Sequence, residues 1–188
     1  MRYDVIAIGA SWGGLQAVGT VLEGIPAEVD QPIVVAQHRS AGSARGVLES
    51  LLQRHSGRPV VEPGDKEPIE PAHVYVAPAD YHLLVEDGRF ALSVDARVQF
   101  ARPSIDVLFE SVAEGYRDRA VGIVLTGANA DGAAGLAAIK RNGGVSIVQD
   151  PATATRKAMP EAAIAASVAD AVLPLEEIGP FLLGLCAT

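Results

Sequence analysis

The sequence predicts a doubly wound α/β fold, with a mostly parallel sheet, helices on both faces and a small antiparallel hairpin. Two observations carry this prediction. Short apolar runs rich in branched residues alternate with helical patterns, and such continuous runs are typical of parallel strands buried on both faces. The chain has 188 residues, 49% of them hydrophobic and 20% charged, which suffices to bury a full core. We therefore expect one domain over residues 1–188.

Each predicted parallel strand is a run of five or six residues. These runs are DVIAI (4–8), PIVVAQ (32–37), VGIVL (121–125) and VSIVQ (145–149). The middle section, HVYVAPADYHLLVEDGRFALSV, contains three shorter strand-like runs. Pro78 interrupts the first pair, and EDGR is typical of a hairpin turn, so this section predicts the antiparallel addition to the sheet.

The helices are predicted from apolar stripes at helical spacing. Over Ser104 to Tyr116, one face carries Ile105, Leu108, Phe109, Val112 and Tyr116. Ser104 is placed to cap that helix. A similar stripe comprises Val47, Leu48, Leu51 and Leu52, and the segment AGLAAIKRNGG predicts a helix that ends at Asn142 or Gly143.

Charge and composition exclude several classes of protein. A formal net charge of −8 disfavours a nucleic-acid binder, which needs basic patches to neutralise phosphates. The only cysteine is Cys186, so neither a disulfide framework nor a cysteine-based zinc site is expected, and a cytoplasmic setting fits. No signal peptide follows Met1, and no apolar run approaches the 18 or so residues of a membrane span, so we expect no membrane insertion. We expect no cofactor and no metal.

The first strand runs directly into a glycine-rich turn, IGASWGG. A phosphate or dinucleotide site is one explanation, but Ser11 stands where the second glycine of G-x-G-x-x-G belongs. Gln37 and His38 occupy the place of the ribose-binding carboxylate, and no GK[ST] is present. The nucleotide hypothesis is therefore disfavoured.

Two hypotheses for Ser11 remain open at this point. Gly9 to Gly13 also match G-x-S-x-G, the sharp strand-to-helix turn that presents a nucleophilic serine above the sheet. In the other hypothesis Ser11 only caps a helix from about Gly13 to Leu22. A nucleophilic serine needs a base and a group that orients the base.

The base and its orienting carboxylate are sought at the carboxyl ends of parallel strands, where open α/β sheets place their sites. Of the four histidines, His38 follows a predicted parallel strand directly, although it could be a solvated loop histidine. Asp131 lies in the glycine-rich loop of VGIVLTGANADGAAG, where it could instead cap the next helix. Asp150, at the next strand end, is the rival carboxylate. The order Ser, His, Asp differs from that of ordinary α/β-hydrolases, which indicates triad chemistry on another scaffold.

The sequence resembles the catalytic domain of the chemotaxis receptor methylesterases, the CheB family. The resemblance rests on segments that follow the family's order over nearly the whole chain: IGASWGG, VAQH, VYVAPADYHL, RPSIDVLFESVA, VLTGANADGAAG and QDPATATRKAMPEAAI. It implies a catalytic triad of Ser11, His38 and Asp131. It also implies hydrolysis of glutamate γ-methyl esters on the cytoplasmic helices of methyl-accepting receptors, with deamidation of receptor glutamines as a related activity.

The resemblance also bears on the oxyanion site and on regulation. We expect the Trp12 N–H and the Gly127–Ala128 turn to supply oxyanion donors, and Met159 is a further pocket candidate. Trp12 and Ala128 depart from the small residue and the methionine that are common in the family. Many members carry an N-terminal receiver domain, whereas this chain begins three residues before its first predicted strand. We therefore expect a standalone domain, differently regulated or constitutively active, unless it is part of a longer protein. A catalytically idle member that acts as a binding module is the alternative.

Overall fold

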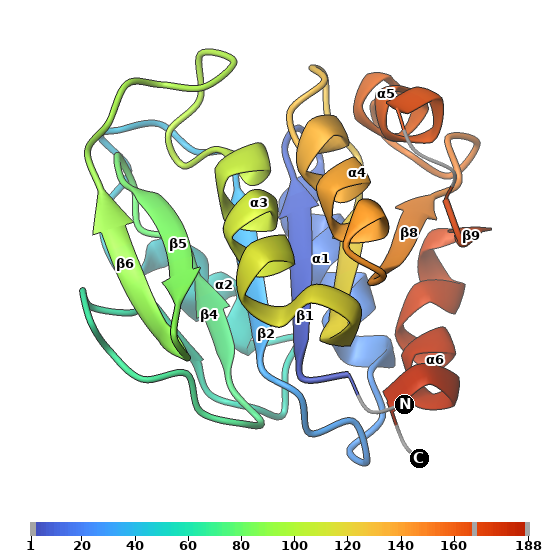
Figure 1. The fold of residues 1–188 in the computed structure, drawn as a ribbon, viewed down its shortest axis with the longest axis horizontal. Helices are drawn as coiled ribbons and strands as arrows, with labels where there is room; N and C mark the ends of the chain where they lie inside the picture. Colours follow the sequence, from blue (N-terminus) through green and yellow to red (C-terminus); the bar gives the residue numbers. More distant parts are fainter. Residues whose placement is uncertain (1–2, 167–168, 187–188) are drawn as a thin grey trace.

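The computed structural model describes residues 3–166 and 169–186 as an α/β fold with seven parallel strands (Figure 1). Their order across the sheet is β3-β4-β2-β1-β7-β8-β9, and every adjacent pair is parallel. The strands are β1 (Val5–Ala10), β2 (Ile33–Gln37), β3 (Val60–Val61), β4 (Val74–Val76), β7 (Ala120–Val124), β8 (Val145–Gln149) and β9 (Ala171–Leu173). The four predicted parallel strands are thus present, and β1 lies between β2 and β7.

Helices cover both faces of the sheet (Figure 1). One face packs against α1 (Gly14–Gly24), α2 (Val47–Gln53) and α6 (Leu175–Cys186), and the other against α3 (Ile105–Tyr116), α4 (Ala133–Arg141) and α5 (Ala158–Ala166). A short 3₁₀ helix, Arg117–Arg119, joins α3 to β7. Because successive side chains of a strand point to opposite faces, β1 sends Ile6 and Ile8 into one core and Val5 and Ala7 into the other. The doubly wound fold predicted from the apolar runs is confirmed.

Of the three strand-like runs predicted to form the antiparallel addition, the first is β4, which pairs parallel with β2 and β3 in the main sheet. The other two form the predicted antiparallel hairpin, β5 (His82–Glu86) and β6 (Arg89–Ser93), joined at Asp87–Gly88. It forms a two-stranded sheet of its own rather than extending the parallel sheet. The Phe90 ring packs against the Tyr75 ring of β4 at a tilt of 54°, with ring centroids 4.6 Å apart, and the Ser111 hydroxyl of α3 accepts a hydrogen bond from the Val85 N–H. The hairpin is therefore anchored by packing against α3 and the sheet face.

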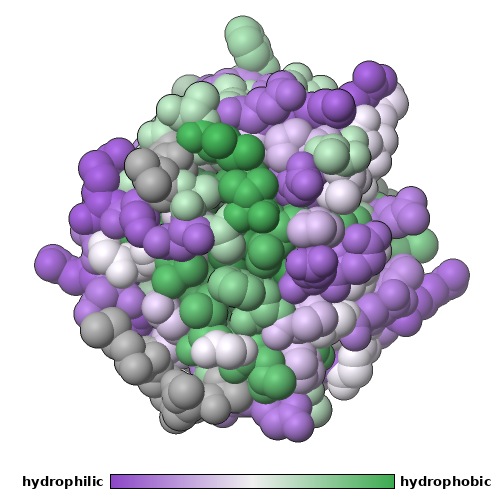
Figure 2. Space-filling model, turned by 90° about the vertical axis from the view of Figure 1, so that its right-hand side faces the viewer, coloured by the Kyte–Doolittle hydropathy of each residue, from purple (hydrophilic) through white to green (hydrophobic). Residues whose placement is uncertain are grey.

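At the edge of the sheet far from the hairpin lies β9, which pairs with β8 and with no other described strand. Figure 2 shows an apolar band on this side of the molecule. The large hydrophobic residues exposed on α5, β9 and α6 are Ile164, Val172, Phe181 and Leu183. Among the described helices, none combines the length and the apolar character needed to cross a membrane.

Candidate active site

Three neighbouring strand ends bring Ser11, His38 and Asp131 together. Ser11 follows β1 and His38 follows β2, while Asp131 lies in the loop between β7 and α4. Backbone hydrogen bonds fix these strand ends against one another: the Ser11 N–H donates to the Thr126 carbonyl at 2.9 Å, and the His38 N–H donates to the Ala10 carbonyl at 3.0 Å. The site therefore lies at the carboxyl edge of the sheet, around the central strand β1.

The His38 ring bridges the other two side chains. Its Nδ1 lies 3.1 Å from Ser11 Oγ, and its Nε2 lies 2.6 Å from Asp131 Oδ2. A carboxylate accepts, so the proton of neutral His38 belongs on Nε2 and leaves Nδ1 to accept from the serine hydroxyl. This is the geometry expected of a nucleophile, a base and an orienting carboxylate.

Asp131 is fully buried, and four donors surround its carboxylate. Besides His38, they are the Ile105 N–H on Oδ2 at 2.8 Å, and the Ser104 hydroxyl and Asp106 N–H on Oδ1, both at 2.9 Å. The carboxylate thus sits at the N-terminus of α3, where a helix favours negative charge. Burial acts to raise the pKa of Asp131, but the hydrogen bonds from His38, Asp106 and Ile105 outweigh it and hold that pKa below its ordinary value.

Neither Ser11 nor Asp131 caps the helix that follows it. The N-cap of α1 is Gly13 and that of α4 is Gly132; both adopt left-handed φ, and as glycines neither has a side chain with which to cap its own helix. The hypotheses that Ser11 caps α1 and that Asp131 caps α4 are therefore wrong. Asp131 serves the N-terminus of a different helix, α3, whose own cap is Ser104 as predicted.

Asp106 makes the reciprocal contacts, although it was not among the residues expected from the sequence. Its Oδ1 accepts from the backbone N–H groups of Gly132 and Gly135 at the start of α4, both at 2.8 Å, and its Oδ2 accepts from Gln99 Nε2 at 3.1 Å. Burial raises the pKa of Asp106 above its ordinary value, and the Asp131 charge adds to this, against the bonds from Gly135, Gly132 and Gln99. Asp106 thereby fixes the loop that carries Asp131.

Two glycines allow α3 to approach the strand ends so closely. A Cβ at Gly9 would lie 2.2 Å from Ile105 Cγ2, and one at Gly132 would lie 2.7 Å from the same atom. Gly132 also has a φ of +94°, which side chains disfavour. The glycine of the G-x-S-x-G pattern therefore makes room for the helix that holds Asp131.

The rival groups lie in other hydrogen bonds. His73 Nδ1 faces the Pro71 carbonyl, and His55 Nδ1 pairs with Glu23 at 2.7 Å. His82 contacts the Ser104 N–H and the Ala96 carbonyl. Asp150 accepts from the Ala152 N–H at 2.8 Å in the turn after β8. Within the described part of the chain, none of these groups is bonded to Ser11 or His38.

The comparison with known proteins agrees with this geometry. Residues 6–182 match the sequence profile described as CheB methylesterase. The chain belongs to this family. The crystal structure of the Thermotoga maritima CheB methylesterase catalytic domain superposes with a TM-score of 0.88 at 32% identity, and covers 98% of this chain and 100% of that one. The family and the fold predicted from the sequence are confirmed.

Similar sequences carry the same description. A Leptospira interrogans protein, provisionally named a protein-glutamate methylesterase/protein-glutamine glutaminase, is 47% identical over 98% of this chain and 96% of its own length. Protein-glutamate methylesterase/protein-glutamine glutaminase 1 of Rhodospirillum rubrum is 40% identical over 97% of this chain. The match spans 48% of that relative, so this chain corresponds to about half of it.

The two departures from the CheB pattern, Trp12 and Ala128, both keep backbone donors. Among the described residues, no acceptor is bonded to the N–H of either one. The Gly127 N–H, in contrast, donates to the Arg156 carbonyl at 3.1 Å and is not free in this structure. The Trp12 side chain is 63% exposed, and the Arg156 guanidinium lies 5.5 Å from its ring centroid.

Met159 is fully buried and does not line an open pocket in this structure. Its N–H donates to the Gly127 carbonyl at 3.0 Å, and a Cβ on Gly127 would lie 2.3 Å from Met159 Cε. Met159 therefore supports the Gly127–Ala128 turn from inside the fold.

Gln37 and Thr126 tie the catalytic loops together, and neither was expected to do so. Gln37 Nε2 donates to the Ser11 carbonyl at 2.8 Å and to the His38 carbonyl at 3.1 Å. Thr126 Oγ1 donates to the Trp12 carbonyl at 3.0 Å and accepts from the Arg156 N–H at 2.9 Å. Polar residues at the last position of a buried strand, such as Gln37, are the sequence signal that could have identified these contacts.

Two cavities are lined in part by His38. A cavity of about 550 Å³ is lined by His38, Arg39, Arg97, Phe100, Arg102 and Asn129 among others. An apolar groove of about 340 Å³ lies between His38 and the side chains of Leu15, Val47, Leu48 and Leu51. His38 is therefore bordered by a basic surface and by an apolar one.

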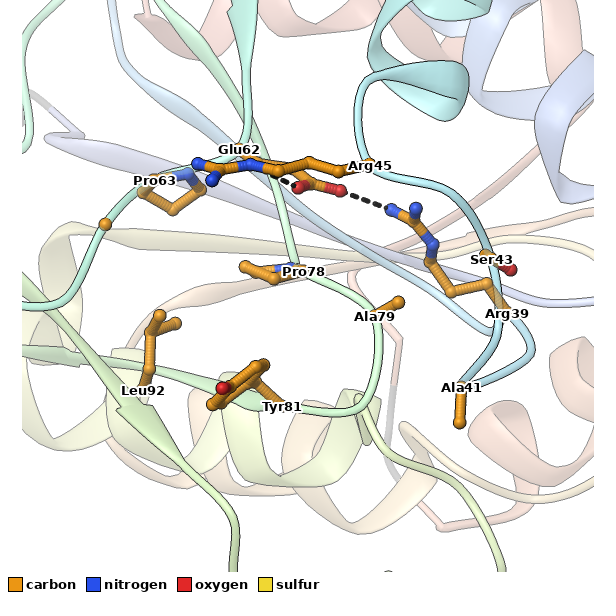
Figure 3. A pocket seen from close by; sticks show the side chains of 11 residues that line it. Arg39, Ala41, Ser43, Arg45, Glu62, Pro63, Pro78, Ala79, Tyr81 and Leu92 are labelled. Carbon is orange, nitrogen blue, oxygen red and sulfur yellow. Dashed lines mark hydrogen bonds and ion pairs between the residues drawn. The ribbon is translucent and has the colours of Figure 1, made fainter.

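A third pocket, of about 350 Å³, adjoins them (Figure 3). Arg39 Nη1 lies 2.8 Å from Glu62 Oε1, and Arg45 Nε lies 3.3 Å from Glu62 Oε2, so the two guanidinium groups converge on one carboxylate. Arg39 also donates to the Ala44 carbonyl. These bonds hold the segment that follows His38. In the described residues, no group of three or more His, Cys, Asp or Glu side chains is placed to bind a metal.

Proposed function

We propose that this protein hydrolyses glutamate γ-methyl esters on methyl-accepting chemotaxis receptors, with Ser11, His38 and Asp131 as its catalytic triad. The observation that carries the proposal is the continuous chain of contacts from Ser11 Oγ through both nitrogens of His38 to the buried Asp131 carboxylate. The family membership supplies the class of ester.

In the acylation step, Ser11 Oγ attacks the ester carbonyl while His38 Nδ1 takes its proton. The resulting imidazolium keeps its Nε2–H on Asp131, whose negative charge stabilises it. His38 then gives the Nδ1 proton to the leaving methoxide, methanol departs, and the glutamyl group remains as an ester on Ser11.

In the deacylation step, water takes the place of methanol. His38 Nδ1 removes a proton from the water, the hydroxide attacks the acyl-enzyme, and the proton returns to Ser11 Oγ. The products are a glutamate side chain and the free enzyme. A glutamine side chain would follow the same steps with ammonia as the leaving group, so one site can serve both activities.

The developing oxyanion needs donors that point at it. The backbone N–H groups of Trp12 and Ala128 are our candidates, because neither is bonded to another acceptor in the described residues. Each donor is a backbone N–H, which any residue except proline retains. Tryptophan at position 12 and alanine at position 128 therefore keep the donors, although both depart from the family pattern. None of these steps requires a metal or cofactor, and the substrate would place the enzyme in the cytoplasm.

Methanol release from receptor fragments methylated at glutamate tests the proposal directly. We expect the wild-type protein to release methanol and the His38→Ala variant to release it at least about 10³ times more slowly. A binding module without catalytic activity would retain the fragment and release no methanol above the rate of the variant.

A further inference from the structure

The loop between β6 and α3 contains a strained two-residue turn. Val98 and Ala101 exchange backbone hydrogen bonds of 3.1 and 2.9 Å, which leaves Gln99 and Phe100 as the central residues. Their φ values are +47° and +65°, so both adopt left-handed backbone. Turns of this kind favour Asn-Gly, because most side chains resist positive φ. Phenylalanine at the second position is costly to the fold.

Packing does not explain the presence of this phenylalanine. The Phe100 side chain is 97% exposed, so it contributes almost no buried area. The turn itself is held in place: Gln99 Nε2 donates to Asp106 Oδ2, the carboxylate that also fixes the loop of Asp131. An exposed aromatic ring on a strained, anchored turn is a feature often found at functional sites.

Phe100 lines the same cavity of about 550 Å³ as His38. Three arginines, Arg39, Arg97 and Arg102, also line it, and no carboxylate does among the described lining residues. Arg102 and Arg97 share one carboxylate, Asp80, at 2.8 and 3.7 Å. This side of the cavity therefore retains positive charge on a chain whose net charge is −8.

We propose that the Gln99–Phe100 turn is a docking element for the protein substrate. Phe100 contacts an apolar side chain of an acidic, amphipathic helical segment, and Arg97 faces carboxylates of the same segment. The identity of the occupant rests on the proposed function, because a protein-glutamate methylesterase acts on a glutamate side chain within a protein. The ring and the charge line the same cavity as His38, so a segment bound there lies next to the base.

The test measures binding and hydrolysis separately, with a methylated chemoreceptor cytoplasmic fragment as the probe. Phe100→Ala removes the ring and keeps the backbone strain, whereas Phe100→Gly removes both. We expect each variant to bind the fragment about tenfold more weakly, and the ratio of kcat/KM for the fragment to kcat/KM for a small methyl ester to fall about tenfold through KM. Phe100→Gly should melt at the wild-type temperature or above it. Phe181→Ala, a half-exposed ring on α6, is the control and should change neither value.

Charge is tested by Arg97→Gln. This variant should weaken binding severalfold at low salt and show a smaller loss of affinity as salt is raised than the wild type does.

The outcomes separate the docking element from the esterase. Equal losses on the fragment and the small ester would mean that the turn only supports the catalytic groups, and would overturn the docking proposal. Fragment affinity unchanged within twofold in both Phe100 variants, or no affinity in the wild type, would overturn it as well. Phe100-dependent binding without methanol release would refute the proposed esterase activity and leave the docking element standing.

Discussion

Asp106 and Asp131 each cap the helix that belongs to the other. Asp131, which precedes α4, accepts from the Ile105 and Asp106 N–H groups at the start of α3, while Asp106 of α3 accepts from the Gly132 and Gly135 N–H groups at the start of α4. The carboxylate that faces His38 is therefore fixed by both helices. This arrangement makes stability and catalysis depend on the same contacts.

Asp106→Ala removes the acceptor of two buried N–H groups at the start of α4. We expect the free energy of unfolding to fall by about 2 to 3 kcal/mol, because the donors are left unsatisfied. Turnover should fall by about 10- to 100-fold, since the loop of Asp131 loses its anchor. Urea unfolding and methanol release measure the two effects. Asp106→Asn, which keeps one acceptor oxygen, is the matched control. Its unfolding free energy and its turnover should both lie closer to the wild-type values.

Asp131→Asn should lower both turnover and stability. The amide retains one acceptor oxygen where four donors converge, so at least one donor would face an NH₂ group. We expect a loss of about 10³ to 10⁴ in kcat and about 2 to 4 kcal/mol in unfolding free energy. Asp150→Asn is the comparison and should change turnover by less than about tenfold. A large loss of turnover in Asp150→Asn with a small loss in Asp131→Asn would contradict this account and assign the orienting role to Asp150.

The stability contributed by the Asp131 carboxylate should depend on pH. Its pKa is lower in the folded protein than the ordinary value of about 3.9, so the unfolded chain binds the proton first as the pH falls. The contribution is complete above about pH 4 and is lost as the pH falls through the folded-state pKa. The difference in unfolding free energy between wild type and Asp131→Asn should therefore shrink as the pH falls below about 4. A difference that grows below pH 4 would contradict this direction.

Trp12→Thr tests whether the oxyanion donor at this position is the backbone. The N–H survives the substitution, so we expect kcat for a small methyl ester to stay within about threefold of wild type. A loss of about 100-fold or more would mean that the indole or its contact with Arg156 takes part in the chemistry of the site.

The strand ends were predictable because buried parallel strands leave continuous apolar runs, and β1, β2 and β7 each end in a polar or glycine-rich segment. That rule made Ser11, His38 and Asp131 the candidates at the strand ends, with Asp150 as the rival carboxylate. The reciprocal caps of Asp106 and Asp131 could not be predicted, because Asp106 and Gly132 are 26 residues apart in the sequence and meet only in the folded structure. The helices α5 and α6 were not identified; Pro160 and Pro180 lie within them, and proline is typical of helix ends rather than interiors.

Short strands escaped prediction for a related reason. β3 has two residues and β9 has three, too few for a period or a run to be recognised. The Gln99–Phe100 turn contains neither glycine nor asparagine, so its sequence gives no sign of the left-handed backbone that it adopts.

The role of Ser11 is the central claim, and methanol release by Ser11→Ala tests it most directly when the unfolding free energy is measured alongside. The Ser11 side chain contacts His38 and caps no helix, so the variant should unfold within about 0.5 kcal/mol of wild type. Methanol release from the methylated receptor fragment should fall by at least about 10⁴-fold, because among the described residues His38 contacts no other hydroxyl or thiol. Methanol release close to the wild-type rate, together with a stability loss of about 1 to 2 kcal/mol, would show that Ser11 serves the fold and not the reaction, and would contradict the triad.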